Sequence, residues 1–174
     1  MGEMSKTQQL AELLESFDTA MLITRHGEGG EHARPMAIAE IEGASTIWFV
    51  TSSDSPKVDE IRKDARVAAT FQSDRKFVAL SGTSAIVRDR ARIEALWKDT
   101  WKIWFPDGKD DPSIALIRVE VEDAEFWDNA GVKGIRYAFE AVKGLIKGER
   151  PEAVAGAHGR VVERNELPAS SRRN

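Results

Sequence analysis

The chain of 174 residues contains no cysteine, which excludes disulfide bonds, thiolate metal sites and cysteine nucleophiles. It also lacks a basic excess, because 25 lysines and arginines face 29 aspartates and glutamates and give a net charge of −4. Proteins that neutralise nucleic-acid phosphates need such an excess, so the composition argues against a nucleic-acid partner. No apolar run approaches the roughly 20 residues that span a bilayer, and the N-terminus shows no signal-peptide pattern. We therefore expect a cytoplasmic protein without a membrane partner.

Histidine is scarce as well, and the sequence lacks the usual motifs of metal and nucleotide sites. None of the three histidines, His26, His32 and His158, has the spacing of a metal site. His26 and His32 flank a glycine-containing loop, where we expect solvated side chains, with a metal site as the alternative. Neither a phosphate-loop nor a dinucleotide-binding glycine fingerprint is present.

What the sequence does contain is a series of short β-rich runs separated by tight turns. Strands are expected at residues 20–25, 33–42, 46–51, 66–72, 76–89 and 113–128. Gly82, inside the fifth run, indicates a bulge or a close backbone approach. With 41% apolar and 31% charged residues, the composition is that of a globular protein. The pattern predicts an α+β, mainly β fold: an antiparallel barrel with helices covering its ends.

Helices are expected at residues 5–17, 56–64, 89–104 and 135–146. The first opens with a capping-box pattern formed by Ser5 and Gln8. The third carries Trp97, Trp101 and Trp104 mainly on one face, which is either a packing face or a surface for stacking a flavin or a base. Trp104 differs from the other two because it borders the loop FPDGKDDPS, and such loops often line binding sites.

The C-terminal part of the chain changes character. From residue 149 it becomes polar and loses its hydrophobic period, ending in PASSRRN. We therefore expect one domain over residues 1–148, followed by a polar tail or extended arm over 149–174. Deleting this tail is expected to leave folding and ligand binding nearly unchanged.

The stretch from residue 34 to 57 contains a conflict with ordinary helix chemistry. Ser55 suits the N-cap and Pro56 the first helical position. Lys57, however, places a cation at the positive end of the helix dipole, where a carboxylate is preferred. Either Lys57 is a solvated surface residue, or an anion is bound there by free N–H groups, serine hydroxyls and the ammonium. Arg34, at the start of the neighbouring strand, could supply a second cation.

A resemblance to a known family rests on the opening helix and the order of five motifs: RPM (34–36), WFVTSSDSPK (48–57), VALSG (78–82), WFPDG (104–108) and IRVEVEDAEFWD (117–128). Over roughly residues 8–130 the chain resembles the FMN-binding split-barrel superfamily that includes pyridoxamine 5′-phosphate oxidase, and within it the bacterial general stress protein family. The resemblance implies an antiparallel split β-barrel and a homodimer with the flavin at the subunit interface. It also implies FMN as the cofactor, with FAD as an alternative.

The resemblance further implies roles for single residues. Arg34 matches the arginine that reaches the FMN phosphate, and Ser55 and Lys57 match the phosphate-binding turn. Trp104 and Trp127 are candidates for contacts around the flavin, including contacts from the other subunit. Along the flavin ring, the matching residues are Pro35, Met36, Thr51 and Ser52. Neither Arg34 nor Lys57 is expected to support the barrel core.

The sequence departs from the vitamin B6 oxidases at several of their functional positions. A substrate-phosphate lysine is replaced by Ala39, an Arg-Lys pair by Pro56-Lys57, and a glutamine by Phe77. The C-terminal Arg- and Trp-containing substrate motif is absent after Trp127. Flavin binding is therefore favoured over oxidation of pyridoxamine 5′-phosphate.

No side chain stands out as a general base, so the chemistry would belong to the cofactor and catalytic residues remain unassigned. The first hypothesis is a homodimeric FMN-binding protein that acts as a flavin-dependent oxidoreductase or reductase with a small-molecule electron donor or acceptor. A second hypothesis is a flavin-binding or flavin-storing protein without turnover. A third keeps the barrel and replaces FMN with a deazaflavin or a haem.

Overall fold

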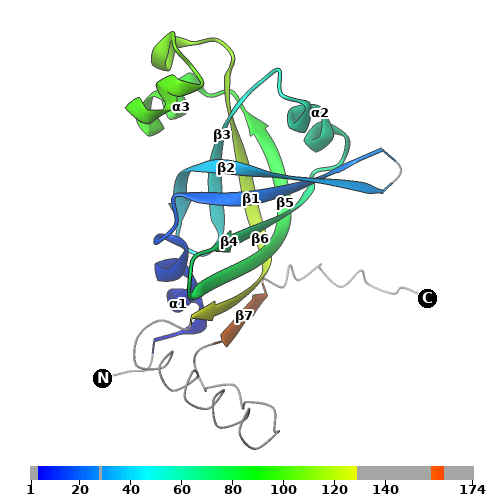
Figure 1. Cartoon of the computed structure of the whole chain (residues 1–174), viewed down its shortest axis with the longest axis vertical. Helices are drawn as coiled ribbons and strands as arrows, with labels where there is room; N and C mark the ends of the chain where they lie inside the picture. Colours follow the sequence, from blue (N-terminus) through cyan, green and yellow to red (C-terminus); the bar gives the residue numbers. More distant parts are fainter. Residues whose placement is uncertain (1–3, 28, 129–157, 163–174) are drawn as a thin grey trace, which may run out of the picture.

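The computed structural model describes residues 4–27, 29–128 and 158–162. Its elements follow in the order α1 (Lys6–Leu14), β1 (Thr19–His26), β2 (Gly30–Glu42), β3 (Thr46–Ser52), α2 (Pro56–Lys63), β4 (Arg66–Gln72), β5 (Lys76–Val87), α3 (Arg90–Leu96), the 3₁₀ turns η1 (Asp99–Ile103) and η2 (Gly108–Asp110), β6 (Ile114–Asp128) and β7 (His158–Val162). Figure 1 shows α1 at one end of the strands and α3 at the other.

The strands form one antiparallel sheet in the order β3-β2-β1-β4-β5-β6-β7, and an additional pairing of β3 with β6 closes the first six into a barrel. This confirms the predicted split-barrel fold. Closure depends on the length of β6: its first half pairs with β3, and its last residues, 123–127, pair with β7. Among the helices of the described residues, none has the length and hydrophobicity needed to cross a membrane.

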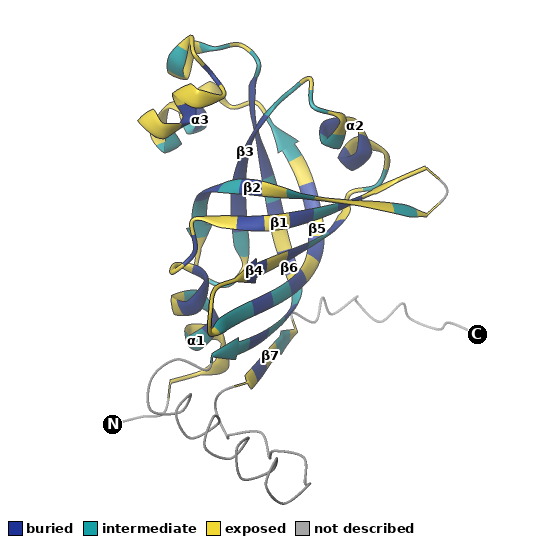
Figure 2. Cartoon of the chain, viewed as in Figure 1, coloured by how far each residue is buried: buried dark blue, intermediate teal, exposed yellow. Residues whose placement is uncertain are grey.

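Strand β3 is buried on both faces, which explains why its sequence does not alternate between apolar and polar residues. Ile47 and Phe49 point into the barrel core, whereas Trp48 and Val50 belong to a second apolar cluster, on the outer face, with residues of α3 and η1. Elsewhere, buried and exposed residues alternate along much of the strands (Figure 2). Strand β3 is therefore held between the core and the helical end that carries the tryptophans.

One predicted helix is confirmed by the structure and another is not. The first is confirmed, with reciprocal hydrogen bonds between Ser5 and Gln8 at its start. The single helix expected over 89–104 is wrong: α3 ends at Leu96, Trp97 adopts extended backbone angles, and a 3₁₀ turn follows. Trp101 is buried and meets Trp97 edge-on at 5.7 Å between ring centroids, so these two residues pack against the fold. Trp104 remains exposed.

Within the predicted polar tail or extended arm, residues 158–162 form strand β7 on the edge of β6. Gly159 lies against the ring of Phe126, and the carbonyl of His158 accepts a hydrogen bond from Lys6 of α1. Deleting residues 149–174 would remove these contacts, so a neutral effect on folding is no longer expected. The helix predicted over 135–146 lies outside the described residues.

Candidate functional site

A cavity of about 400 Å³ opens beside β2 and the end of β3, a volume within the range of small-molecule sites. Seven of the nine residues proposed from the sequence line it: Pro35, Met36, Thr51, Ser52, Ser55, Lys57 and Trp104. Strand β2 supplies one side and the C-terminal end of β3 the other. The turn between β3 and α2 contributes Ser55, and the loop after η1 places exposed Trp104 beside buried Phe105.

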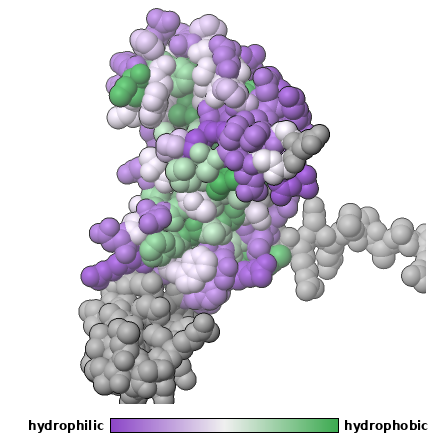
Figure 3. All heavy atoms as spheres, turned by 45° about the vertical axis from the view of Figure 1, so that its right-hand side comes forward, coloured by the Kyte–Doolittle hydropathy of each residue, from purple (hydrophilic) through white to green (hydrophobic). Residues whose placement is uncertain are grey.

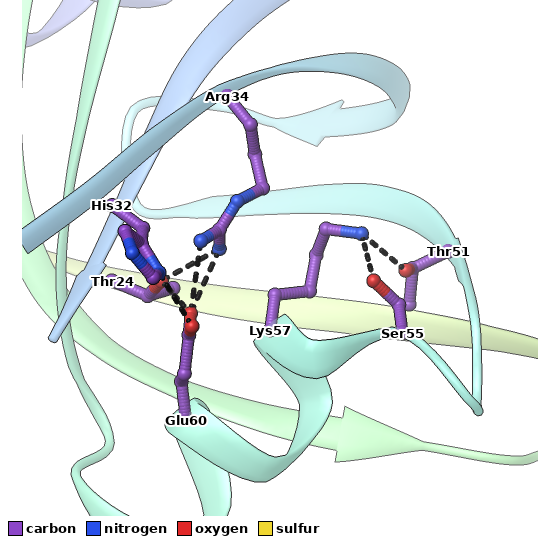
Figure 4. A network of polar contacts seen from close by, with 7 residues as sticks. All are labelled: Thr24, His32, Arg34, Thr51, Ser55, Lys57 and Glu60. Carbon is purple, nitrogen blue, oxygen red and sulfur yellow. Dashed lines mark hydrogen bonds and ion pairs between the residues drawn. The ribbon is translucent and has the colours of Figure 1, made fainter. Parts of the chain in front are cut away.

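Lys57 extends from the first turn of α2 toward the end of β3 (Figure 4). Its ammonium donates hydrogen bonds to the hydroxyls of Ser55 and Thr51, the latter at 3.2 Å. Ser55 is the N-cap residue, but its side chain makes no capping hydrogen bond. Within the described part of the chain, no carboxylate lies within ion-pair distance of the Lys57 ammonium.

The surroundings of Lys57 disfavour its positive charge when no anion is bound beside it. Burial lowers the pKa of Lys57, the positive charge of Arg34 lowers it further, and Glu60 acts in the opposite direction. The ammonium also lies in the first turn of α2, at the positive end of the helix dipole. A cation desolvated in this position, with hydroxyls as its partners, would be stabilised by a bound anion. The alternative of a fully solvated surface lysine does not describe this half-buried side chain.

Arg34 does not line the cavity; its guanidinium turns toward Glu60 of α2 (Figure 4). Both terminal nitrogens donate to one carboxylate oxygen, Oε2, each at 3.0 Å. Nη1 also donates to the hydroxyl of Thr24 at 2.7 Å, and Nδ1 of His32 lies 2.7 Å from the other oxygen of Glu60. Burial alone would raise the pKa of Glu60, but the hydrogen bonds from Thr24, His32 and Arg34 lower it to about 2.

These contacts bear on two expectations. Arg34 lies outside the barrel core, but it joins β2 to α2 through a nearly buried carboxylate, so we now expect its removal to lower the stability of the fold. His32 binds Glu60 and its ring stacks on His26 at 3.7 Å, so it is not simply a solvated loop residue. Among the described residues, no group of three potential ligands could hold a metal ion.

Glu60 should make the stability of the fold depend on acidity. Because its pKa falls from 4.5 to about 2 on folding, the carboxylate contributes fully above pH 4.5, and this contribution is lost as the pH falls toward 2. The difference corresponds to about 3 kcal/mol of unfolding free energy. Urea unfolding between pH 5 and pH 2 should therefore show a larger loss of unfolding free energy in wild type than in Glu60→Gln. Equal acid sensitivity of the two proteins would contradict this assignment.

Trp127 lies near the opposite end of β6 from the cavity. Its strand partners are Phe77 and His158, and its ring stacks on that of His158 with centroids 5.2 Å apart. The cavity adjoins Ser52, which pairs with Ile114 at the start of the same strand. Within one chain, therefore, Trp127 does not border the cavity, and a contact from a second subunit stays a prediction.

Sequence reasoning missed Thr24 and Glu60. Glu60 lies in the charged run KVDEIRK, where a solvated side chain is the ordinary expectation, and Thr24 lies in an apolar strand. The available signal was the spacing of three between Lys57 and Glu60, which places both on one face of α2.

Comparison with known proteins identifies the family of this chain. The model of the pyridoxamine 5′-phosphate oxidase-like family matches residues 5–152. The chain belongs to this family. General stress protein 26 of Bacillus subtilis is 27% identical to this chain over 138 residues, which cover 76% of this chain and 95% of that protein.

Two further relatives extend the comparison. Protein bli-3 of Neurospora crassa is 29% identical over 133 residues, which cover 70% of this chain but only 64% of bli-3. The crystal structure of the general stress FMN/FAD binding protein of Xanthomonas citri is 32% identical, with a TM-score of 0.61 over 72% of this chain and 89% of that one. The chain is thus a pyridoxamine 5′-phosphate oxidase-like barrel of the general stress protein type.

Proposed function

We propose that the cavity binds FMN, with the phosphate at Lys57 and the ring system between β2 and the end of β3. The observation that carries the proposal is the ammonium of Lys57, desolvated at a helix N-terminus and bound to hydroxyls alone among the described residues. The donor chemistry fits a phosphate monoester, because ammonium, hydroxyl and backbone N–H groups are all donors to oxygen anions. Flavin binding by the relative from Xanthomonas citri supports the same choice.

The cavity also fits the remainder of a flavin. Its walls include Pro35, Met36, Ala37, Val50 and Trp104, the apolar and aromatic lining typical of cofactor sites. FAD would need further room beyond its first phosphate, so FMN is the simpler ligand for this volume. No described side chain in the cavity is a carboxylate or histidine, so none offers itself as a general base.

A bound flavin would supply electron transfer, and the chain's own residues would bind it and orient it toward a small-molecule donor or acceptor. We therefore propose a flavin-dependent oxidoreductase or reductase in preference to a B6 oxidase. The position of the oxidases' substrate lysine is occupied by Ala39, which lies in the apolar cluster outside the barrel. Anaerobic NADH or NADPH should bleach the bound flavin; a flavin that stays oxidised with both would indicate binding without reduction by these donors.

We propose that two copies complete the site. The cavity is open on one side, and Trp104, which lines it, is 58% exposed. The next residue in the chain, Ile103, is 78% exposed, and hydrophobic residues gather on one face of the barrel (Figure 3). Covering such surface is a main reason for stable association, and an obligate interface buries roughly 2,000 Å² or more. Light scattering of the flavin-bound protein at micromolar concentration should give the mass of a dimer. A monomer mass would remove the two-subunit site.

Lys57→Ala should weaken FMN binding by about one to two powers of ten, because a charge-assisted hydrogen bond to phosphate contributes roughly 1.5–3 kcal/mol. Riboflavin, which lacks the phosphate, should bind wild type and variant with similar, poor affinity. Flavin fluorescence titration measures all four dissociation constants. Lys63→Ala, at the far end of the same helix, is the control and should leave both affinities unchanged. If Lys57→Ala weakens riboflavin as much as FMN, the phosphate assignment is wrong.

A further inference from the structure

The guanidinium of Arg34 is occupied along one edge only. Its two terminal nitrogens share Oε2 of Glu60 at 3.0 Å each, and Nη1 uses its second hydrogen for Thr24. The other edge consists of Nε–H and the remaining hydrogen of Nη2, and the described residues provide no partner for either. Such an edge presents two parallel N–H groups, the geometry that matches two oxygens of a phosphate or carboxylate.

The direction of every hydrogen bond around Glu60 can be assigned. A carboxylate only accepts, so the single hydroxyl hydrogen of Thr24 goes to Glu60, and the hydroxyl oxygen accepts from Arg34. Nδ1 of His32 donates to the second carboxylate oxygen. Thr24 is fully buried and Glu60 is 9% exposed, so the hydrogen bonds that join Thr24, Glu60 and Arg34 are shielded from water. Strands β1 and β2 and helix α2 thereby hold the guanidinium in one orientation.

We propose that Glu60 is a positioning residue for the anion site: it holds one edge of Arg34 so that the other edge presents two N–H groups to the phosphate beside Lys57. The inference rests on the proposed function, because it assumes that a phosphate occupies this place. The side chains of Arg34 and Lys57 lie next to each other between β2 and α2 (Figure 4), and the charge of Arg34 lowers the pKa of Lys57. One anion placed between them would interact with both cations. Glu60 itself would not touch the phosphate.

Two physical roles for Glu60 predict opposite effects of its carboxylate on phosphate binding. A carboxylate near an anion site repels the anion, so a Glu60 that merely competes for Arg34 would weaken phosphate binding. A Glu60 that orients Arg34 would strengthen it, because a preorganised fork loses less rotamer freedom on binding. Removing its charge while keeping its shape distinguishes these cases by the sign of the effect.

The experiment compares wild type, Glu60→Gln and Asp59→Asn by fluorescence titration with FMN and with riboflavin. Asp59 is the matched control, since it is the neighbouring carboxylate on α2, is 70% exposed at its side chain and pairs with Arg62. Glu60→Gln should weaken FMN by roughly five- to tenfold and leave riboflavin unchanged. Asp59→Asn should leave both affinities unchanged or slightly strengthen FMN. A role limited to folding would change both ligands alike, so the ratio of the two affinities is the decisive quantity.

Thr24→Val is a second variant for the case that Glu60→Gln folds poorly, because it keeps the side-chain shape and removes only the hydroxyl that accepts from Arg34. Thr24→Val should also lower the affinity for FMN relative to that for riboflavin, by a smaller factor than Glu60→Gln. Unchanged or tighter FMN binding in Glu60→Gln, or in Thr24→Val if it alone folds, would overturn the positioning role while leaving the flavin site in place. A wild type that binds FMN and riboflavin equally would overturn the phosphate site and this role together.

Discussion

Gly82→Ala is expected to lower the unfolding free energy by about 3 kcal/mol or more, because the barrel has no room for one added methyl group. A Cβ at this position would lie 1.9 Å from the backbone oxygen of Glu120. The neighbour is backbone of a long central strand, not the end of a flexible side chain, so it cannot move without disturbing β5 and β6. Chemical denaturation should show the midpoint shifted strongly downward or the folded state absent.

The close approach arises from a register change between the two strands. Ser81 pairs with Asp123 and Gly82 with Val121, so Glu122 is an extra residue on β6 opposite the glycine. The N–H of Val121 donates to the carbonyl of Ser45, which links the bulge to the β2–β3 turn. Ser81→Ala is the matched control, since its exposed side chain neighbours the glycine, and it should change stability by less than about 0.5 kcal/mol. Near-wild-type stability of Gly82→Ala would contradict the tight packing.

Gly82 also illustrates how much of this fold could be predicted from sequence. An interior glycine in an otherwise β-rich run indicated a close approach, and β-rich runs between turns located all six barrel strands within a few residues. The closing pair could not be found this way. Ile47 and Val119 pair across the barrel seam although 72 positions separate them in the chain. Neither hydrophobic period nor turn chemistry encodes a pairing at that distance.

Two elements were not predicted from the sequence, the early end of helix α3 and strand β7, and the reasons differ. The tryptophan spacing after Asp89 suits a helix, yet Lys98 leaves the helical path and donates to the carbonyl of Ile38, beside a bulge in β2. Tertiary contact overrides local preference there. Strand β7 was missed because its five residues, HGRVV, are too few and too polar for a clear β signal, and the edge of β6 supplies their hydrogen bonds.

The candidate site was predicted where local chemistry is unusual and missed where it is ordinary. Lys57 conflicts with the helix dipole, so a bound anion stood beside a solvated lysine as an explanation, and the family resemblance favoured the anion. Glu60 conflicts with nothing in a charged helix; only the fold shows that Thr24 and His32, from two different strands, converge on it. Partnerships between distant segments carry no signature in a single sequence.

Arg34→Ala is expected to weaken both the ligand site and the fold. Loss of Arg34 leaves Glu60 nearly buried and without its cationic partner, which lowers the unfolding free energy of the ligand-free protein by about 3 kcal/mol. This is the lower end for a broken buried pair, in keeping with an Arg34 side chain that is 22% exposed. FMN binding should weaken by roughly tenfold or more, and riboflavin binding much less.

A double variant separates the two effects, because Arg34→Ala combined with Glu60→Ala leaves no charge unpaired. It should be more stable than Arg34→Ala alone and should still bind FMN poorly. Lys57→Ala provides the contrast, since Lys57 has no ion pair among the described residues and its removal should cost the ligand-free protein little or even stabilise it. Urea denaturation of all four proteins without flavin tests the scheme. Equal stability of Arg34→Ala and Lys57→Ala would mean that the Arg34–Glu60 pair does not hold β2 to α2.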